Sequence, residues 1–362
     1  MAFRLLVLLP LALLGTGATA WGVLAIRYSD IESDGVRLAL AVAFAVFGLV
    51  AVGAFLHPRT RWWAAASFVV GFGLVLAWWS GIPPSNDRDW APEYAVVPRA
   101  TVDGDLVTLH DVRNFDYRTE TDFTPRYEER RCDLRRLESL DLVASYWMGE
   151  AIAHVMLSFG FGGEDFVAVS VETRRERTEG YSTIAGFFKR YELFYVVADE
   201  RDLIRLRTNY RENPPEDVYV YRTNAPPERI RRVFLDYVRE INSLAEEPRW
   251  YNTLTTNCTT AIVTHLRVNP GAAPMSWKVL LSGYAPRYAW ERGALDTRLS
   301  FEELEKRSRV NEAARAADRA PDFSRRIRVG LPVPLPRTRS PWRNRVLGQG
   351  IRPQAGSVLA KE

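Results

Sequence analysis

WYNTLTTNCTTAIVTH, residues 250–265, places Cys258 between short polar residues and an apolar run. Asn257 and Thr259 favour a helix start here, because their side chains can hydrogen-bond backbone N–H groups that lack a partner within the helix. A cysteine in the first turn faces those N–H groups and the positive end of the helix dipole, which favour the nucleophilic thiolate. The segment therefore predicts a reactive cysteine. The alternatives are a buried structural cysteine and a disulfide to Cys132, the only other cysteine.

The composition of the 362-residue chain is uneven. Its mean hydropathy is −0.18, yet its first 82 residues are strongly apolar. The chain has a net charge of +4. From Pro321 onward there are nine Arg or Lys and two acids, so the residues before Pro321 carry a slightly negative net charge. This distribution argues against a nucleic-acid-binding protein. Two cysteines are too few for a cysteine zinc site, and no Walker loop, GxGxxG or HExxH motif occurs, so we expect no cofactor and no metal.

Three long uncharged stretches near the N-terminus predict helices that cross a membrane. They are Leu5–Ile26, Leu38–Leu56 and Trp62–Ile82, each close to the roughly 20 residues that span a bilayer. Arg59 and Arg61 lie in the short loop between the second and third stretches, and the positive-inside rule favours such a loop in the cytoplasm. Everything after the third stretch then lies outside the cytoplasm.

The first stretch has a second interpretation as a cleaved signal peptide. Ala18–Thr19–Ala20 fits a small-residue cleavage site, which would remove residues 1–20. The apolar run continues to Ile26, so we expect a retained helix. The second and third spans return the chain to the same side of the membrane, so the location of the large domain does not depend on this choice.

The remaining sequence predicts a domain between a linker and a tail. Residues 1–82 form the membrane anchor, and residues 83–100, with four prolines, read as the linker. Residues 101–320 hold the patterns typical of a folded domain. Residues 321–362 are basic, contain proline and predict a disordered tail.

Short segments rich in aromatic and β-branched residues predict one mostly antiparallel sheet, and hence an α+β domain. These segments are Leu106–Val112, Leu142–Trp147, Ile152–Phe159, Phe166–Thr173, Tyr191–Val197, Leu203–Thr208 and Val218–Tyr221. Pro226–Leu244 predicts the clearest helix, because its apolar residues recur at helical spacing behind a proline. Residues 181–190 predict a short helix, and residues 294–320 predict a charged surface helix.

A nucleophilic cysteine needs a base, and the chain has four histidines. His57 lies in a membrane loop, and His265 follows Cys258 by two helical turns, out of hydrogen-bond reach. His110 and His154 lie in or beside predicted strands. We predict that His154 is the base, because its apolar strand AIAHVMLSFGFG gives little other reason for an imidazole. The alternative is a structural histidine.

A third polar group is expected to orient the base. The hairpin after His154 turns near Gly162–Gly163 and returns as VAVSVETR. A two-residue loop would place Val171 opposite His154, whereas a loop one residue longer would place Glu172 there, on the same face. We predict Glu172, with Ser170 or a backbone carbonyl as alternatives.

Five segments between Asp111 and about His265 carry a resemblance to a known family. They are DVRNFDYRTETDFTPRYEER (111–130), DLVASYWMGEAIAHVMLSFGF (141–161), VSVETR (169–174), YELFYVVADERDLIRLRTNYR (191–211) and WYNTLTTNCTT (250–260). Over roughly 155 residues the sequence resembles the bacterial Lnb-type periplasmic domain family. That family resembles in turn the circularly permuted NlpC/P60-like, papain-type folds, in which the histidine strand precedes the cysteine helix.

The resemblance implies Cys258 as nucleophile and His154 as base. Together with the three predicted spans, it leads us to expect a multi-pass protein of the bacterial inner membrane, with its large C-terminal domain in the periplasm. The implied activity is lipoprotein N-acyl transfer, in which an acyl chain passes from a phospholipid to the N-terminal amine of a lipoprotein through a Cys258 thioester. The backbone around Cys258 and Thr259 would stabilise the oxyanion. Asn257 would cap the helix or orient the site.

Two other classes of function stay open at this stage. A cysteine hydrolase would use the same Cys–His pair with water as acceptor, on peptidoglycan peptides or on lipids. A non-catalytic, membrane-anchored binding domain would contain Cys258 only as a structural residue. An acyltransferase needs an apolar groove that faces the bilayer, whereas a peptidase needs a polar cleft directed away from it.

Overall fold

The computed structural model describes residues 2–335. Three helices long and apolar enough to cross a membrane come first: α1 (Ala2–Arg27), α2 (Asp34–Leu56) and α3 (Arg61–Gly81). Small residues let them approach one another, since a Cβ on Gly48 would collide with Thr19 and one on Gly22 would collide with Phe44. The three apolar stretches are therefore helical, as the sequence predicts.

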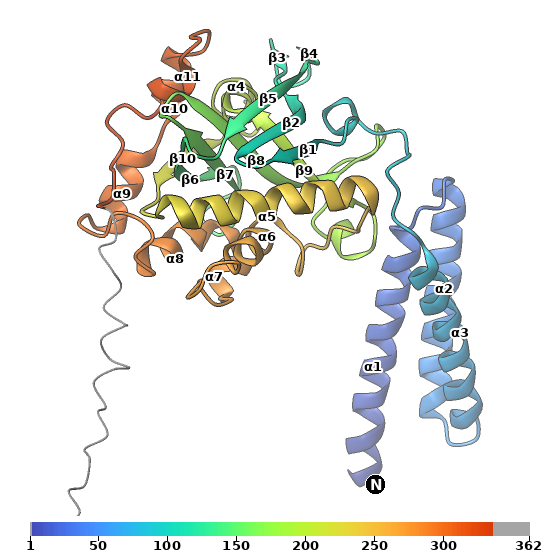
Figure 1. The fold of residues 1–362 in the computed structure, drawn as a ribbon. Coiled ribbons are helices and arrows are strands. Elements are labelled where there is room, and N and C mark those ends of the chain that lie inside the picture. Colours follow the sequence, from blue (N-terminus) through green and yellow to red (C-terminus); the bar gives the residue numbers. More distant parts are fainter. Residues whose placement is uncertain (1, 336–362) are drawn as a thin grey trace, which may run out of the picture.

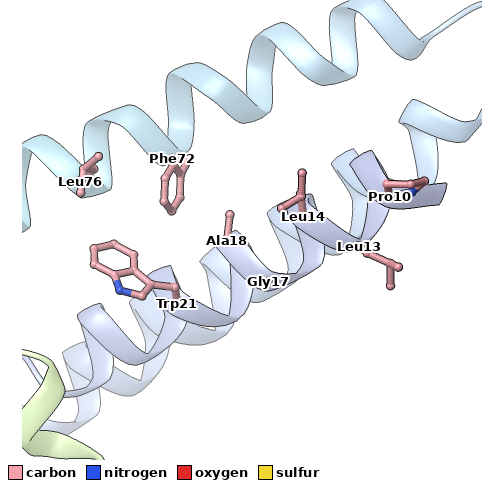
Figure 2. Close-up of a pocket in the computed structure, with 8 residues that line it drawn as sticks. All are labelled: Pro10, Leu13, Leu14, Gly17, Ala18, Trp21, Phe72 and Leu76. Carbon is pink, nitrogen blue, oxygen red and sulfur yellow. The ribbon is translucent and has the colours of Figure 1, made fainter. Parts of the chain in front are cut away.

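An apolar groove lies between α1 and α3 (Figure 2). It is lined by Pro10, Leu13, Leu14, Gly17, Ala18, Trp21, Phe72 and Leu76. Trp21 closes one end, where its ring centroid lies 5.7 Å from that of Phe72 and 6.1 Å from that of Phe188 in the large domain. The groove thus runs along the apolar helices and ends at the domain.

The large domain is built on an eight-stranded, mostly antiparallel sheet (Figure 1). Its strands are β1 (Arg99–Asp103), β2 (Leu106–Arg113), β5 (Tyr127–Asp133), β6 (Leu137–Tyr146), β7 (Ala153–Phe161), β8 (Asp165–Arg174), β9 (Glu192–Asp199) and β10 (Asp217–Arg222). The order is β1-β2-β9-β8-β7-β6-β10, with β5 also paired to β2. The single parallel contact joins Arg113 of β2 to Ala198 of β9. A separate two-stranded ladder pairs β3 (Asp116–Tyr117) with β4 (Phe123–Thr124).

Alternate strand residues point to opposite sides of the sheet, and apolar residues occur on both sides, so helices cover both faces. Val155 and Leu157 contribute to the core under α5 (Pro227–Glu246) and α6 (Cys258–Leu266). Met156, between them, belongs to the second core. That core packs against α4 (Glu200–Arg205), the π-helical turn η3 (Leu206–Tyr210), α10 (Asn311–Ala316) and α11 (Phe323–Arg326).

The remaining elements are short. They are η1 (Pro92–Tyr94), η2 (Ala185–Phe187), α7 (Trp277–Leu280), η4 (Ser282–Tyr284), α8 (Ala285–Glu291) and α9 (Phe301–Ser308). Figure 1 shows α5 to α8 on the side of the sheet from which the membrane helices extend, and α4, α10 and α11 on the other side.

Two local predictions are wrong. Leu203–Thr208 is helical and not a strand, because Asp199 caps α4 and Leu203 is fully buried in the second core. Residues 294–320 do not form one helix. The chain is extended at Arg309, which bridges to Tyr219 of β10, so the segment divides into α9 and α10.

The predicted disordered tail starts too early. Phe323 and Ile327 are buried in the second core. Arg328 lies 2.8 Å from Asp141 and 2.6 Å from Glu200, both buried carboxylates. These contacts fold the chain back onto the sheet after residue 321. The rest of the predicted tail, residues 336–362, lies outside the described residues.

The segment between β8 and β9 joins the domain to the membrane helices. Lys189 Nζ donates to the carbonyls of Trp79, Ser80 and Ile82 at the end of α3, at 3.0 to 3.2 Å. Arg190 donates to the carbonyl of Ser29, beyond the end of α1, at 3.0 Å. These bonds satisfy backbone carbonyls left free where helices end.

Candidate active site

The first turn of α6 is fixed by a capping box. The side-chain oxygen of Asn257 accepts a hydrogen bond from the Thr260 N–H at 2.9 Å, and Thr260 Oγ1 accepts from the Asn257 N–H at 2.8 Å. The Asn257 amide also donates to the Thr253 carbonyl at 2.8 Å. Asn257 therefore both starts the helix and holds the preceding loop, which positions Cys258 as the first helical residue.

Cys258 is a free, half-buried thiol that packs at the edge of the core under α5 and α6. Burial raises the pKa of this thiol, although the N–H groups of Val155, Thr259 and Cys258 itself act in the opposite direction. Local helix geometry predicts a thiolate, but desolvation outweighs it, so the resting sulfur is protonated. Cys132 is also free and is buried in β5, so no disulfide joins the two cysteines.

His154 lies one residue from Val155, whose N–H faces the Cys258 sulfur. The Nε2 atom of His154 is 2.5 Å from Ser170 Oγ, and the Ser170 hydroxyl donates to Glu172 Oε1 at 2.8 Å. Glu172 Oε1 is itself 3.6 Å from Nε2. The imidazole is thus oriented by Ser170 and Glu172 together, the two side chains that the sequence offered as alternatives.

The hairpin loop decides this arrangement. β7 and β8 are separated by three residues, Gly162–Glu164, and Leu157 pairs with Val169. Continuing that register by three residues in each strand brings His154 opposite Glu172. The longer of the two predicted loops is therefore the one observed. Gly162 and Gly163 both have positive φ, which glycine adopts without strain.

Glu172 is mostly buried, with 13% of its side chain exposed, and it is charged. Burial alone would raise the pKa of its carboxyl, but Arg207, His154 and Arg113 outweigh burial and lower that pKa. Arg207 makes the closest cationic contact, at 3.1 Å. The hydroxyl of Tyr94 donates to the second carboxylate oxygen at 3.3 Å.

The His154 imidazole is neutral at neutral pH. Burial and the nearby Arg207 lower its pKa to about 4, although Glu172 acts to raise it. Within residues 2–335 no hydrogen bond joins His154 to Cys258, and His154 Nδ1 has no hydrogen-bond partner. Cys258 therefore contacts the β7 backbone at Val155, one residue from His154, and the resting state is a neutral thiol and a neutral imidazole.

The other histidines have different surroundings. His265 Nδ1 lies 2.8 Å from Asp236 and its Nε2 lies 2.8 Å from the Tyr195 hydroxyl, so it joins α6 to α5 and β9. His110, on β2, is half-exposed and lies 3.4 Å from Glu129.

Arg207 and Tyr94 are site residues that the sequence analysis missed. Tyr94 comes from η1, inside the predicted linker. Arg207 belongs to the π-helical turn η3, an uncommon element that occurs frequently at functional sites. The sequence predicts a strand for the segment that contains Arg207. No local pattern pairs Arg207 with Glu172, which lies 35 residues earlier.

Within residues 2–335 no group of three or more His, Cys, Asp or Glu side chains could hold a metal ion. The candidate site contains one thiol on α6, one imidazole on β7 and one charged carboxylate on β8.

The geometry defines a mixed α+β domain with a free cysteine at a helix start, attached to three apolar helices. Residues 123–283 match the model of the Lnb N-terminal periplasmic domain family. This match includes Cys258, His154 and Glu172, and it confirms the resemblance read from the sequence. Together with the apolar helices, it indicates a membrane protein with a periplasmic domain. No curated protein and no solved structure matches the chain.

Proposed function

We propose that this protein is a thiol acyltransferase of the bacterial inner membrane, with its catalytic domain in the periplasm. It would move an acyl chain from a phospholipid to the N-terminal amine of a lipoprotein. The observation that carries the proposal is the position of Cys258. Its sulfur meets the N–H groups of Val155 and Thr259 beside His154, in an Lnb-type domain fixed to membrane helices.

The first half-reaction would acylate the cysteine. As the sulfur attacks the ester carbonyl of a phospholipid, His154 takes the thiol proton, for which Nδ1 is the unengaged nitrogen. The N–H groups of Val155 and Thr259 stabilise the oxyanion. When the carbon–oxygen bond breaks, the imidazolium returns its proton to the departing lysophospholipid oxygen. The products are a thioester on Cys258 and a lysophospholipid.

The second half-reaction would release the acyl chain to an amine. The amine attacks the thioester, His154 accepts its proton, and the proton passes to the departing sulfur, which restores the thiol. In both steps the imidazole becomes transiently charged. The charged Glu172 carboxylate, 3.6 Å away, favours that state and offsets part of the cost of burying a charged imidazole.

The arrangement along the chain supports a papain-type origin for this chemistry. The strand that carries His154 precedes the helix that carries Cys258, which is the order of the circularly permuted NlpC/P60-like domains that the sequence resembles. Attachment to the membrane supports a lipid donor, because a tethered enzyme meets membrane substrates at a high effective concentration.

Intact mass spectrometry of the full-length protein, incubated with phospholipid vesicles, tests the proposal. We expect a mass increase of one acyl group that maps to Cys258 and disappears when a peptide with a diacylglyceryl-cysteine N-terminus is added. Cys258→Ala should abolish the adduct, and Cys132→Ala is the matched control that should keep it. Fatty acid release without amine acylation would identify a hydrolase. No adduct and no released product would favour the binding domain.

A further inference from the structure

Exposed apolar side chains surround the start of α6 on three separate segments. Tyr181, Ile184 and Phe187 come from the β8–β9 connection, Leu254 from the loop before α6, and Trp277 and Leu281 from α7 and its end. Each is between 40% and 58% exposed. We call these six residues the apolar rim. Scattered exposed hydrophobic residues are ordinary, but a group of them marks a contact surface.

Hydrogen bonds join two segments of the apolar rim to each other and the third segment to the cysteine helix. Thr253 donates from its side chain to the Thr183 carbonyl at 2.8 Å, and from its backbone to the Gly186 carbonyl at 3.1 Å. Thr259, next to Cys258, donates to the Val279 carbonyl of α7 at 2.6 Å. The apolar rim is therefore one structural unit around Cys258.

The same unit is attached to the membrane helices. Lys189 and Arg190 bond the backbone where α3 and α1 end. The ring of Phe188 stacks on Tyr28, with 6.1 Å between the centroids. Ile184 is five residues from Lys189, so the two lie within about 18 Å even in an extended chain. Figure 1 shows α7 on the side of the domain from which the membrane helices extend.

We propose that the apolar rim inserts into the outer leaflet of the membrane that α1 to α3 span. An insertion of roughly 5–10 Å is typical of apolar surfaces at the headgroup boundary. It would hold the start of α6, and with it Cys258, near the level of the lipid ester groups. The occupant is the bilayer and not a protein partner, because the bonds from Lys189 and Arg190 already hold this surface at the membrane. The contact is expected whichever reaction Cys258 performs.

Environment-sensitive fluorophores on single introduced cysteines test this contact. The full-length protein with Cys132→Ala and Cys258→Ala would carry Ile184→Cys, Leu254→Cys or Trp277→Cys, labelled with NBD, in nanodiscs of phosphatidylethanolamine and phosphatidylglycerol. Val329→Cys is the matched control. That residue is apolar, 77% exposed, and follows α11 on the far side of the sheet.

We expect shorter-wavelength NBD emission and a loss of fluorescence with 5-doxyl lipid at all three rim positions, but not at Val329. Rim labels that behave like the Val329 label would overturn the proposal. Quenching at Ile184 alone would also overturn it, because the membrane helices tether that segment directly. Circular dichroism verifies folding of each variant. The reporter proteins lack Cys258, so the result is independent of acyl transfer.

Discussion

Ser170 Oγ lies between His154 Nε2 and Glu172 Oε1, at 2.5 Å and 2.8 Å, and therefore connects the imidazole to a charged carboxylate. The direct distance between imidazole and carboxylate is 3.6 Å. A hydroxyl can accept from one group and donate to the other, so Ser170 fixes the ring orientation. Nδ1 has no hydrogen-bond partner among residues 2–335, so it is the nitrogen that the proposed reaction would use, with Ser170 as a proposed positioning residue.

Ser170→Ala should lower acyl transfer while leaving the protein folded. Without the bridging hydroxyl, the imidazole loses its orientation, and we expect about a 10- to 100-fold lower kcat, which is less than the roughly 10²- to 10⁴-fold that the base itself contributes. Ser170→Thr, which keeps a hydroxyl, should restore part of the lost kcat. Ser158→Ala is the matched control, because Ser158 is a buried β7 hydroxyl bonded to Glu200. Equal losses in both alanine variants would mean that Ser170 is only structural.

Alkylation of Cys258 should be slow at pH 6–7. Burial raises the thiol pKa, and a neutral His154 with a pKa near 4 provides no cation at that pH. The rate should rise only above the ordinary thiol range of about 8.5. The rate of iodoacetamide alkylation between pH 5 and 10 measures this dependence. His154→Ala should hardly alter this profile although it abolishes turnover. Rapid reaction at pH 6 that depends on His154 would reveal a resting ion pair.

Acid should destabilise the wild-type protein more than a His154→Gln variant. The native pKa of His154 is about 4, whereas an unfolded histidine titrates near 6.5. Between these values the unfolded state binds a proton that the native state does not, so stability is lost as pH falls from about 6.5 to 4. The effect is up to roughly 3 kcal/mol. Thermal unfolding at pH 7 and pH 5 should show a smaller Tm difference in the variant; equal differences would contradict the shift.

Arg328→Met should destabilise the domain strongly. It leaves Asp141 and Glu200 buried, 0% exposed and without their shared cation, and breaking a buried pair costs about 3–5 kcal/mol. Arg325→Met is the control on the neighbouring helix, because Arg325 is 66% exposed and an ion pair at the surface, such as its bond to Asp322, adds little stability. Chemical unfolding compares the two. Similar midpoints would show that residues after 321 do not support the fold.

A reporter that is active only outside the cytoplasm should work when fused after Glu362 and be silent when inserted between His57 and Arg61. Two further spans follow the first, and the basic loop favours the cytoplasm. Reversed signals would place the domain in the cytoplasm and contradict both the lipoprotein acceptor and the outer-leaflet contact.

The sequence by itself determined the elements that depend on local pattern. Continuous apolar stretches specify the membrane helices, and alternation of large apolar residues specifies strands such as β7 and β8. Asn257 and Thr260 specify the start of α6, because a capping box needs only residues three positions apart. These signals were sufficient to single out Cys258 and His154.

Only the tertiary structure decided how these parts meet. The three-residue turn set the β7–β8 register, and Glu172 lies 3.6 Å from His154 beyond the last strand pair. Arg207 reaches that carboxylate from a π-helical turn that local propensity did not predict. Burial reversed the thiolate tendency of the helix start at Cys258, because desolvation depends on the packed neighbours and not on local sequence. Arg328 likewise orders the chain beyond residue 321 through carboxylates more than a hundred residues away, a pairing that no local pattern encodes.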